Sequence, residues 1–172
     1  QYHDILKDIS YYCPKIDEYA MTEFIKMHVI GRPILGIVGT GSSQGKFTLQ
    51  LGLRQSLLKK GYKVAQLGTE PTAQLFGIDC VYPMGHESSV YTKGFGAVLK
   101  LNQMMGYLES KNPDLIIFGS QANTIPARVG GAQDYPVVQH ELILGCQADA
   151  YILCISSDAS INYIKRTIAY LE

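Results

Sequence analysis

The chain has 172 residues, of which 47% are hydrophobic and 17% charged, so it is long and apolar enough to fold as one domain and is not a disordered chain. Its fifteen basic and fifteen acidic side chains cancel, which excludes the strongly basic surface typical of proteins that bind nucleic acid or anionic membranes. No apolar stretch approaches the roughly 20 residues that span a bilayer, and no signal-peptide pattern is visible. We therefore expect a cytoplasmic protein.

The first thirty residues are expected to form a helical lead-in, or a linker from a preceding domain. In DEYAMTEFIKMHVI, residues 17–30, four apolar side chains can share one helical face: Tyr19, Phe24, Ile25 and Met27. The chain begins without methionine and ends within an amphipathic pattern, so we expect an additional domain of the same polypeptide. The main domain is placed at residues 31–172.

Residues 34–48, ILGIVGTGSSQGKFT, join an apolar strand to a glycine-rich loop and an apparent helix start. Glycines at 39, 41 and 45 permit positive φ angles and close approach of the main chain to a ligand. Successive N–H groups can then point inward at a helix N-terminus, where the macrodipole favours anions, and Lys46 adds a positive charge. The stretch predicts a phosphate-binding loop. Its candidate contacts are Gly39, Thr40, Gly41, Ser42, Ser43, Gln44, Gly45, Lys46, Phe47 and Thr48.

The spacing of this loop departs in two ways from the common P-loop, G-x-x-x-x-G-K-[ST]. Gly39 and Gly45 enclose five residues instead of four, and Phe47 follows the lysine where a hydroxyl residue is usual. In the common loop that hydroxyl coordinates Mg²⁺. Thr48 can take this role if the helix begins one residue later; otherwise it is a residue of the helix surface.

Strands and helices alternate after the loop. The predicted elements are a helix over 47–60, a strand over 62–67, a helix over 96–109, a strand over 114–119, a helix over 137–144, a strand over 151–155 and a helix over 160–172. The first helix should turn four leucines inward: Leu49, Leu53, Leu57 and Leu58. The connections over 68–94 and 120–136 are long and polar, which is typical of functional loops. This alternation predicts a parallel sheet with right-handed crossovers.

Four segments resemble motifs of the DUF1611 family. GTGSSQGKFT resembles its GT-x4-GK-x-T loop, and three softer matches are DLIIFGSQANTIP at 114–126, ADAYILC at 148–154 and LGTEPTAQLFG at 67–77. The resemblance covers residues 34–172. It implies a three-layer α/β P-loop domain with a parallel sheet, similar to dethiobiotin synthetase and more distantly to MinD-like ATPases. It leaves open that this chain holds only part of that domain.

Polar residues that follow the predicted strands are further candidates, because chemistry in an open α/β sheet gathers at the carboxyl ends of its strands. These residues are Thr69, Glu70, Ser120, Gln121, Asn123 and Ser156 to Asp158. The candidates for catalysis are Lys46, Glu70 and Gln121, and those for holding a metal are Thr48 and Glu70. Asp158 is another acidic candidate, and Arg128 is a candidate for acting on phosphate in cis or across a homodimer interface. Each has an alternative role as an ordinary turn or surface residue.

One departure from the resembled family concerns catalysis. The family has an acid at the end of the strand in which this chain has Gly119. A carboxylate there normally holds Mg²⁺ or its water, which neutralises charge on the transferred phosphoryl group. Hydrolysis is therefore left open, and Glu70 is the candidate replacement.

Cysteine and histidine residues give no metal motif. Cys13, Cys80, Cys146 and Cys154 form no C-x-x-C pair, and His3, His28, His86 and His140 are dispersed. Reduced, structural thiols are expected.

Three functions remain. The first is a nucleotide-binding P-loop domain that uses ATP or GTP with Mg²⁺ and transfers a phosphoryl group to a small carboxylate or peptide. The second, implied by the resemblance, is a coenzyme A-dependent N-acyltransferase whose loop holds the phosphates of coenzyme A. The third is a degenerate P-loop that binds a nucleotide or anion as a regulatory module. The expected partners are a small-molecule substrate and a second copy of the chain, with no nucleic acid and no membrane.

Overall fold

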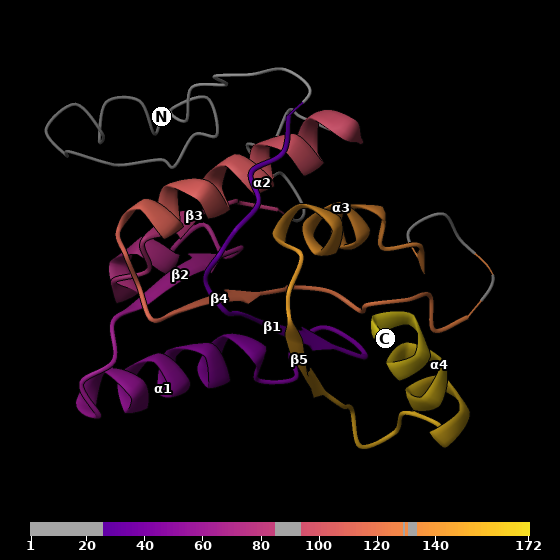
Figure 1. The fold of residues 1–172 in the computed structure, drawn as a ribbon. Coiled ribbons are helices and arrows are strands. Elements are labelled where there is room, and N and C mark those ends of the chain that lie inside the picture. The colour runs from indigo at the N-terminus through magenta and orange to yellow at the C-terminus, as the bar shows by residue number, and fades with distance from the viewer. Residues whose placement is uncertain (1–25, 85–93, 129, 131–133) are drawn as a thin grey trace, which may run out of the picture.

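The structure is a computed structural model that describes residues 26–84, 94–128, 130 and 134–172. Its centre is a five-stranded sheet in the order β3-β2-β4-β1-β5, in which every pairing is parallel (Figure 1). The strands are β1 (Ile34–Gly39), β2 (Val64–Gly68), β3 (Cys80–Val81), β4 (Leu115–Gly119) and β5 (Ala150–Cys154). The helices are α1 (Lys46–Lys59), the short 3₁₀ helix η2 (Ala73–Phe76), α2 (Phe95–Ser110), α3 (Val137–Cys146) and α4 (Ile161–Leu171). The predicted parallel α/β fold is confirmed.

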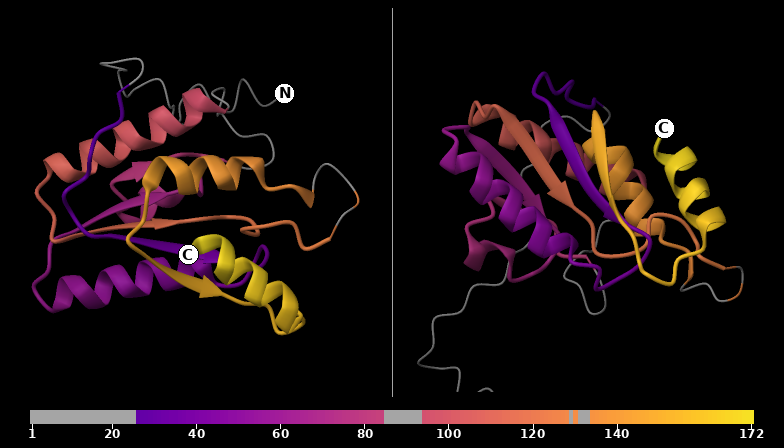
Figure 2. Two further views of the ribbon diagram at one scale, coloured as in Figure 1. Left: turned by 45° about the vertical axis from the view of Figure 1, so that its right-hand side comes forward. Right: turned by 90° about the horizontal axis from the view of Figure 1, so that it is seen from below.

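Helices cover both faces of the sheet, which gives the predicted three layers (Figure 2). Strand side chains alternate between faces, so Ile34, Leu67 and Phe118 pack in one cluster with residues of α2 and α3. Ile37, Val64 and Ile117 pack on the opposite face against α1. The carboxyl ends of the strands are thus held at one edge between two apolar layers. Within the described ranges, no helix combines the length and the apolar composition that crossing a bilayer requires.

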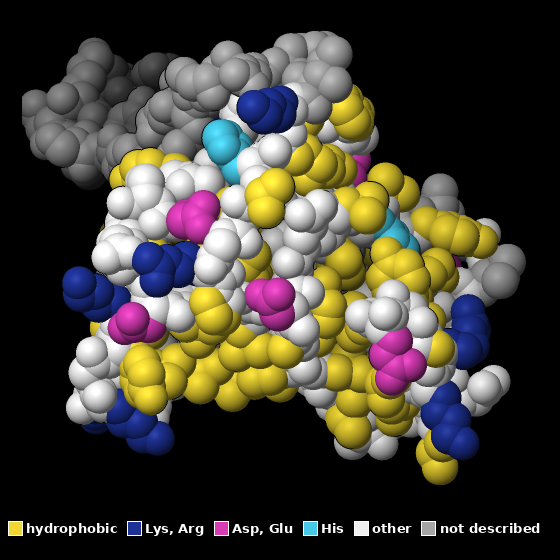
Figure 3. Space-filling model, viewed as in Figure 1, with side chains coloured by type: hydrophobic (Ala, Val, Ile, Leu, Met, Phe, Trp, Pro, Cys, Tyr) yellow, Lys and Arg dark blue, Asp and Glu magenta, His cyan; other side chains and the backbone are white. Residues whose placement is uncertain are grey.

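The inward face of α1 differs from the predicted one. Leu53 and Leu57 pack against the sheet as expected, but Leu49 and Leu58 are 37% and 45% exposed. The inward stripe follows i, i+3, i+7 spacing and therefore begins at Gln50, which is 1% exposed. Figure 3 shows hydrophobic side chains at the surface over α1. The prediction for Leu49 and Leu58 is wrong because the four leucines are spread over more of the helix circumference than the sheet covers.

Strand β3 was not predicted. It has two residues, too few for an alternating pattern, and it pairs Cys80 with Leu67 and Val81 with Gly68. Together with η2 it occupies part of the long polar connection after β2. That connection therefore extends the sheet by one short edge strand.

The described end of the lead-in segment is not helical. Residues 26–30 have no regular structure, and the rest of the predicted helix lies outside the described residues. The backbone of His28 instead pairs with the Asn102 side chain of α2: its amide donates to Oδ1 at 2.6 Å and its carbonyl accepts from Nδ2 at 3.1 Å. These bonds fix the segment against α2, which explains why it does not form a helix there. The domain boundary at residue 31 stays a prediction.

Candidate functional site

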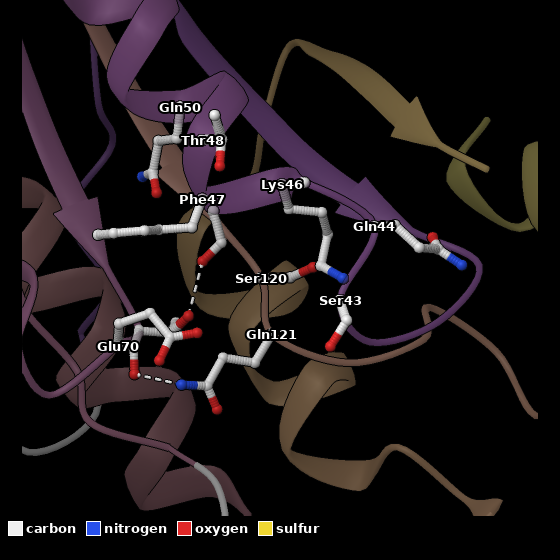
Figure 4. A pocket seen from close by; sticks show the side chains of 12 residues that line it. Ser43, Gln44, Lys46, Phe47, Thr48, Gln50, Glu70, Ser120 and Gln121 are labelled. Atoms are coloured by element: carbon white, nitrogen blue, oxygen red, sulfur yellow. Dashed lines mark hydrogen bonds between the residues drawn. The ribbon is translucent and has the colours of Figure 1, made fainter. Parts of the chain in front are cut away.

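A cavity of about 360 Å³ opens at the carboxyl edge of the sheet, where β1 connects to α1 (Figure 4). Three connections line this loop cavity: the one after β1, the one after β2 and the one after β4. Its lining residues are Ser43, Gln44, Gly45, Lys46, Phe47, Thr48, Gln50, Thr69, Glu70, Gly119, Ser120 and Gln121. All three residues predicted to be catalytic, Lys46, Glu70 and Gln121, are among them.

The loop between β1 and α1 has unpaired backbone donors. Ser43 and Gly45 adopt left-handed φ angles of 56° and 78°. None of the backbone amides of residues 41 to 45 donates a hydrogen bond within the described chain. Alternation of left-handed and right-handed residues is the conformation that turns successive N–H groups to one side as an anion-binding nest. The loop therefore presents a set of donors without protein acceptors at the start of α1.

Gly39 and Gly41 lie directly beneath other side chains of the loop. Of the three glycines that could adopt positive φ angles, Gly39, Gly41 and Gly45, only Gly45 does so. A Cβ atom at Gly39 would lie 2.9 Å from both Gln44 Oε1 and Lys46 Cδ, and one at Gly41 would lie 2.8 Å from Gln44 Nε2. Side chains of the same loop thus fold tightly over these two glycines.

Thr40 and Gln44 hold the loop in shape. The Thr40 side chain is buried, and its hydroxyl accepts a hydrogen bond from the Ser156 amide at 2.9 Å and pairs with the Gln44 side chain. The Thr40 amide donates to the carbonyl of Cys154 at the end of β5. In Figure 4 the Gln44 side chain points away from the centre of the cavity. Both residues support the loop through side-chain contacts within the protein.

Lys46 is 4% exposed and folds back over the loop, where its Nζ donates to the Gly41 carbonyl at 2.5 Å. Burial lowers the pKa of Lys46, because the charged form is separated from water. The neighbouring Cys154 thiol and the Glu70 carboxylate oppose this and raise the pKa. A buried ammonium beside unpaired amide donors is a strong electrostatic attractant for an anion.

The opposite wall of the cavity carries Glu70, Gln121 and Ser120. Gln121 Nε2 donates to the Thr69 carbonyl at 2.9 Å, and the Thr69 hydroxyl donates to the Gly119 carbonyl at 3.1 Å, which joins the ends of β2 and β4 (Figure 4). Ser120 is 5% exposed, and its Oγ has no hydrogen-bond partner within the described part of the chain. Ser120 and Lys46 both line the cavity. A buried hydroxyl without a partner is unusual, and a ligand oxygen here would satisfy it.

Gln50 occupies the space that a side chain at position 119 would need. A Cβ atom at Gly119 would lie 2.5 Å from Gln50 Oε1 and 2.8 Å from its Cδ. The Gln50 side chain is fixed, because its Nε2 donates to the Leu67 carbonyl at 2.8 Å. Position 119 therefore holds a residue without a side chain where the buried Gln50 amide of α1 fills the space. Gln50 was missed as a site residue, although a polar residue on the inward stripe of α1 was a visible signal.

Phe47 and Thr48 have separate positions at the helix start. Phe47 packs edge-on against Phe76, with ring centroids 5.5 Å apart, and contacts the small cluster around Ile78. It anchors α1 to η2. Thr48 lines the cavity and is exposed, but in Figure 4 its side chain and that of Glu70 do not point toward one another. That Thr48 and Glu70 hold one metal ion stays a prediction.

Among the sequence candidates that do not line the loop cavity are Asn123, Arg128 and Asp158. Asn123 donates to the Ile125 carbonyl at 2.8 Å. Arg128 is 78% exposed in its side chain and pairs with Asp134 at 3.4 Å. Asp158 is exposed, and a hydrogen bond from the Ser156 hydroxyl lowers its pKa. The fold does not bring these side chains to the lysine.

A tyrosine that sequence reasoning missed supports the loop from α4. The Tyr163 hydroxyl lies 3.1 Å from the Thr40 carbonyl and 2.8 Å from the Ile125 carbonyl, and it is buried. It links α4 to the connections after β1 and β4. Nothing in the local sequence around Tyr163 indicates this contact, because its partners are 123 and 38 residues away.

The site has the features of a P-loop domain. A strand of a parallel sheet leads into a glycine-rich loop, and a lysine lies in the first turn of the helix that follows. A family model described as "Domain of unknown function (DUF1611_C) P-loop domain" matches residues 26–166. The chain belongs to this family, and the resemblance found in the sequence is confirmed. No curated protein is significantly similar to the chain.

Among solved structures, a DUF1611 family protein from Anabaena variabilis is similar, with a TM-score of 0.55 and 20% sequence identity. The match covers 75% of this chain and 36% of that one, so the chain spans about a third of the solved protein. At this identity the likeness shows the fold alone. APS kinase CysC from Mycobacterium tuberculosis matches with a TM-score of 0.33 and 13% identity, over 81% of this chain and 96% of that one. The TM-score of this second match is too low for any conclusion about this chain.

Proposed function

We propose that the domain binds ATP or GTP with Mg²⁺ at the loop cavity and transfers a phosphoryl group to a small carboxylate or peptide. The observation that supports this most is the run of backbone amides from residue 41 to 45, which have no acceptor within the described residues, beside the buried ammonium of Lys46. Polyphosphate is the ligand that matches several N–H donors and a lysine at a helix start. The Ser120 hydroxyl, which has no hydrogen-bond partner among the described residues, adds a third kind of donor on the opposite wall of the cavity.

Each residue has a proposed task. The loop amides and Lys46 hold the β and γ phosphates, and Gln121 orients the group that attacks. Glu70, with Thr48 as the second candidate, would hold Mg²⁺ or its water. Mg²⁺ usually takes one or two carboxylates and completes its shell with phosphate oxygens and water, so one acid is sufficient. When bound, Mg²⁺ would neutralise charge on the transferred phosphoryl group. Catalysis would then consist of positioning and charge stabilisation.

A regulatory module that binds a nucleotide without turnover is the second candidate. It is favoured by the pairing of Gly119 with Gln50, because that amide fills the place of an acid and cannot carry its charge. The resemblance also implies the N-acyltransferase, in which the same nest would hold the phosphates of coenzyme A. For the leading function the proposal includes a cytoplasmic location and a small-molecule co-substrate.

A calorimetric titration with ATP, GTP and acetyl-CoA, each with and without Mg²⁺, separates these functions. We expect a triphosphate to bind, with affinity that Mg²⁺ increases, followed by release of phosphate or its transfer when a co-substrate is present. Coenzyme A binding that does not depend on Mg²⁺ would support the acyltransferase. Triphosphate binding without turnover would support the regulatory module. Absence of binding by all three ligands would refute the proposed site.

A Glu70→Gln variant tests the metal ligand. We expect it to lose most of the increase in triphosphate affinity that Mg²⁺ provides, about tenfold, because removal of a ligand-holding group commonly costs 10- to 100-fold in metal affinity. Metal-free binding should stay the same or become tighter, since a negative charge leaves the cavity. The control is Asp158→Asn, which removes an exposed acid outside the cavity. A Glu70→Gln protein with unchanged Mg²⁺ dependence would exclude this residue as the metal ligand.

A further inference from the structure

A second cavity, of about 560 Å³, adjoins the loop cavity on the side of α3. Gln121 lines both cavities, and Ser42 of this side cavity is the neighbour of Ser43 in the other. The remaining lining comes from the segment after β3, the connection after β4 and the start of α3. The residues are Ser42, Met84, Gln121, Ala122, Asn123, Tyr135, Pro136, Val137, Val138 and Gln139. A molecule held here would lie next to a phosphate held by the loop.

Gln139 is the exceptional residue of the side cavity. It is 2% exposed, and neither its Nε2 nor its Oε1 has a hydrogen-bond partner within the described residues. It lies on the stripe of α3 that carries Leu142 and Cys146 into the core, one turn nearer the carboxyl edge of the sheet. Burial of an amide without partners is unfavourable, and leucine at this position would continue the apolar stripe. The amide is thus explained by a ligand more readily than by packing.

The chemistry of the lining narrows the class of ligand. A carboxamide both donates and accepts, so its complement carries an N–H and a C=O side by side. No charged side chain is among the described residues that line the side cavity. The described lining therefore favours an uncharged part of a ligand. Tyr135, Val137 and Val138 are 48%, 61% and 40% exposed and offer an apolar wall to short side chains or methyl groups.

We propose that the side cavity binds the amide portion of a small peptide-like molecule, whose N–H and C=O pair with Oε1 and Nε2 of Gln139. This rests on the proposed function, because it identifies the phosphoryl acceptor as peptide-like. The amide end lies against α3, and the reactive end extends past Gln121 toward the loop cavity. Gln139 is a binding residue in this scheme and touches no phosphate.

The test uses a simple diamide, N-acetylalanine methylamide, as the probe, with ligand-observed NMR on the purified protein. We expect the wild-type protein to bind the diamide and Gln139→Leu to bind it about tenfold more weakly, because one paired amide edge is lost. The methyl ester analogue, which lacks the C-terminal N–H but keeps the acetyl amide, should bind the wild type more weakly than the diamide does. Gln139→Leu should also unfold at a higher temperature, since it removes an unpartnered buried amide. The control is Gln55→Leu, the same change at an exposed position of α1 on the opposite face of the sheet.

The outcomes separate this inference from the proposed function. Three results would each overturn the assignment of the side cavity as an amide-binding site. The wild type and Gln139→Leu could bind the diamide equally, or the wild type could fail to bind it. Gln139→Leu could also unfold at a lower temperature than the wild type. A triphosphate titration of the same two proteins should give equal affinities. If neither protein binds a triphosphate, while the diamide still binds the wild type more tightly than Gln139→Leu, then phosphoryl transfer is refuted and the assignment of the side cavity stands.

Discussion

Replacement of Lys46 by methionine is expected to weaken the binding of ATP or GTP with Mg²⁺ by at least about 100-fold. Charge-assisted hydrogen bonds to phosphate contribute about 1.5–3 kcal/mol each. The Lys46 ammonium has donors left for phosphate besides the one paired with the Gly41 carbonyl, in addition to its long-range attraction. Methionine keeps the length and apolar packing of the side chain, so the loop should retain its shape. The measurement is the calorimetric titration described above. The matched control is Lys165→Met, at an exposed position of α4.

The same variant should be more stable than the wild type in the absence of ligand. Burial lowers the pKa of Lys46 below its ordinary value of 10.5, so at neutral pH the folded state holds a charge at a cost. The unfolded state binds more protons between the two pKa values, and wild-type stability therefore rises with pH across that window. The advantage of Lys46→Met should be full below the folded pKa and shrink as the pH approaches 10.5.

Thermal unfolding measured from pH 7 to pH 10.5 checks this sign. A Lys46→Met protein that is less stable than the wild type at neutral pH would mean that the contact from Nζ to the Gly41 carbonyl outweighs the cost of burial. A variant that binds triphosphate as well as the wild type would refute the site itself.

Gly119→Ala should destabilise the protein by about 1–3 kcal/mol, because its Cβ would lie 2.5 Å from Gln50 Oε1. For a protein of this size that lowers the unfolding temperature by roughly 2–4 °C per kcal/mol. The Gln50 side chain cannot shift freely, since its Nε2 is bonded to the Leu67 carbonyl and the residue is 1% exposed. In a Gln50→Ala background the same change should cost little.

A double-mutant cycle measured by thermal or urea unfolding gives the coupling between positions 50 and 119, which we expect to be about 1–2 kcal/mol. The control is Gly52→Ala, also a change of glycine to alanine, at a position of α1 where a Cβ meets no atom within 4 Å. That variant should gain about 0.5–1 kcal/mol from helix propensity. If the changes in unfolding free energy at positions 50 and 119 are additive, the Gln50 side chain is not the reason that position 119 needs glycine. A coupling of the expected size would mean that an acid at 119 requires removal of Gln50 as well.

Local sequence was sufficient to predict the order of the elements and the position of the glycine-rich loop. A phosphate-binding type of loop needs particular residues within one short segment of backbone, so its pattern can be read as consecutive residues of the sequence. Here the pattern consists of the strand before Gly39, the left-handed glycine at 45 and the lysine that follows. The four α-helices and the strands other than β3 were also predicted, with ends that differ by at most two residues, whereas the 3₁₀ helix η2 was not predicted. β3 was missed because two residues of edge strand carry no periodicity.

The sequence by itself determined a parallel α/β P-loop domain and its glycine-rich loop with Lys46, because both depend on contacts between near neighbours in the chain. Only the tertiary structure decided which polar side chains are buried around that loop. Gln50, Ser120 and Gln139 are 1%, 5% and 2% exposed, and each is buried by elements distant in sequence. Arg128 and Asp158, equally plausible from the sequence, lie outside the loop cavity. Burial of a polar group depends on how helices pack across the sheet, and this packing is a property of the whole fold.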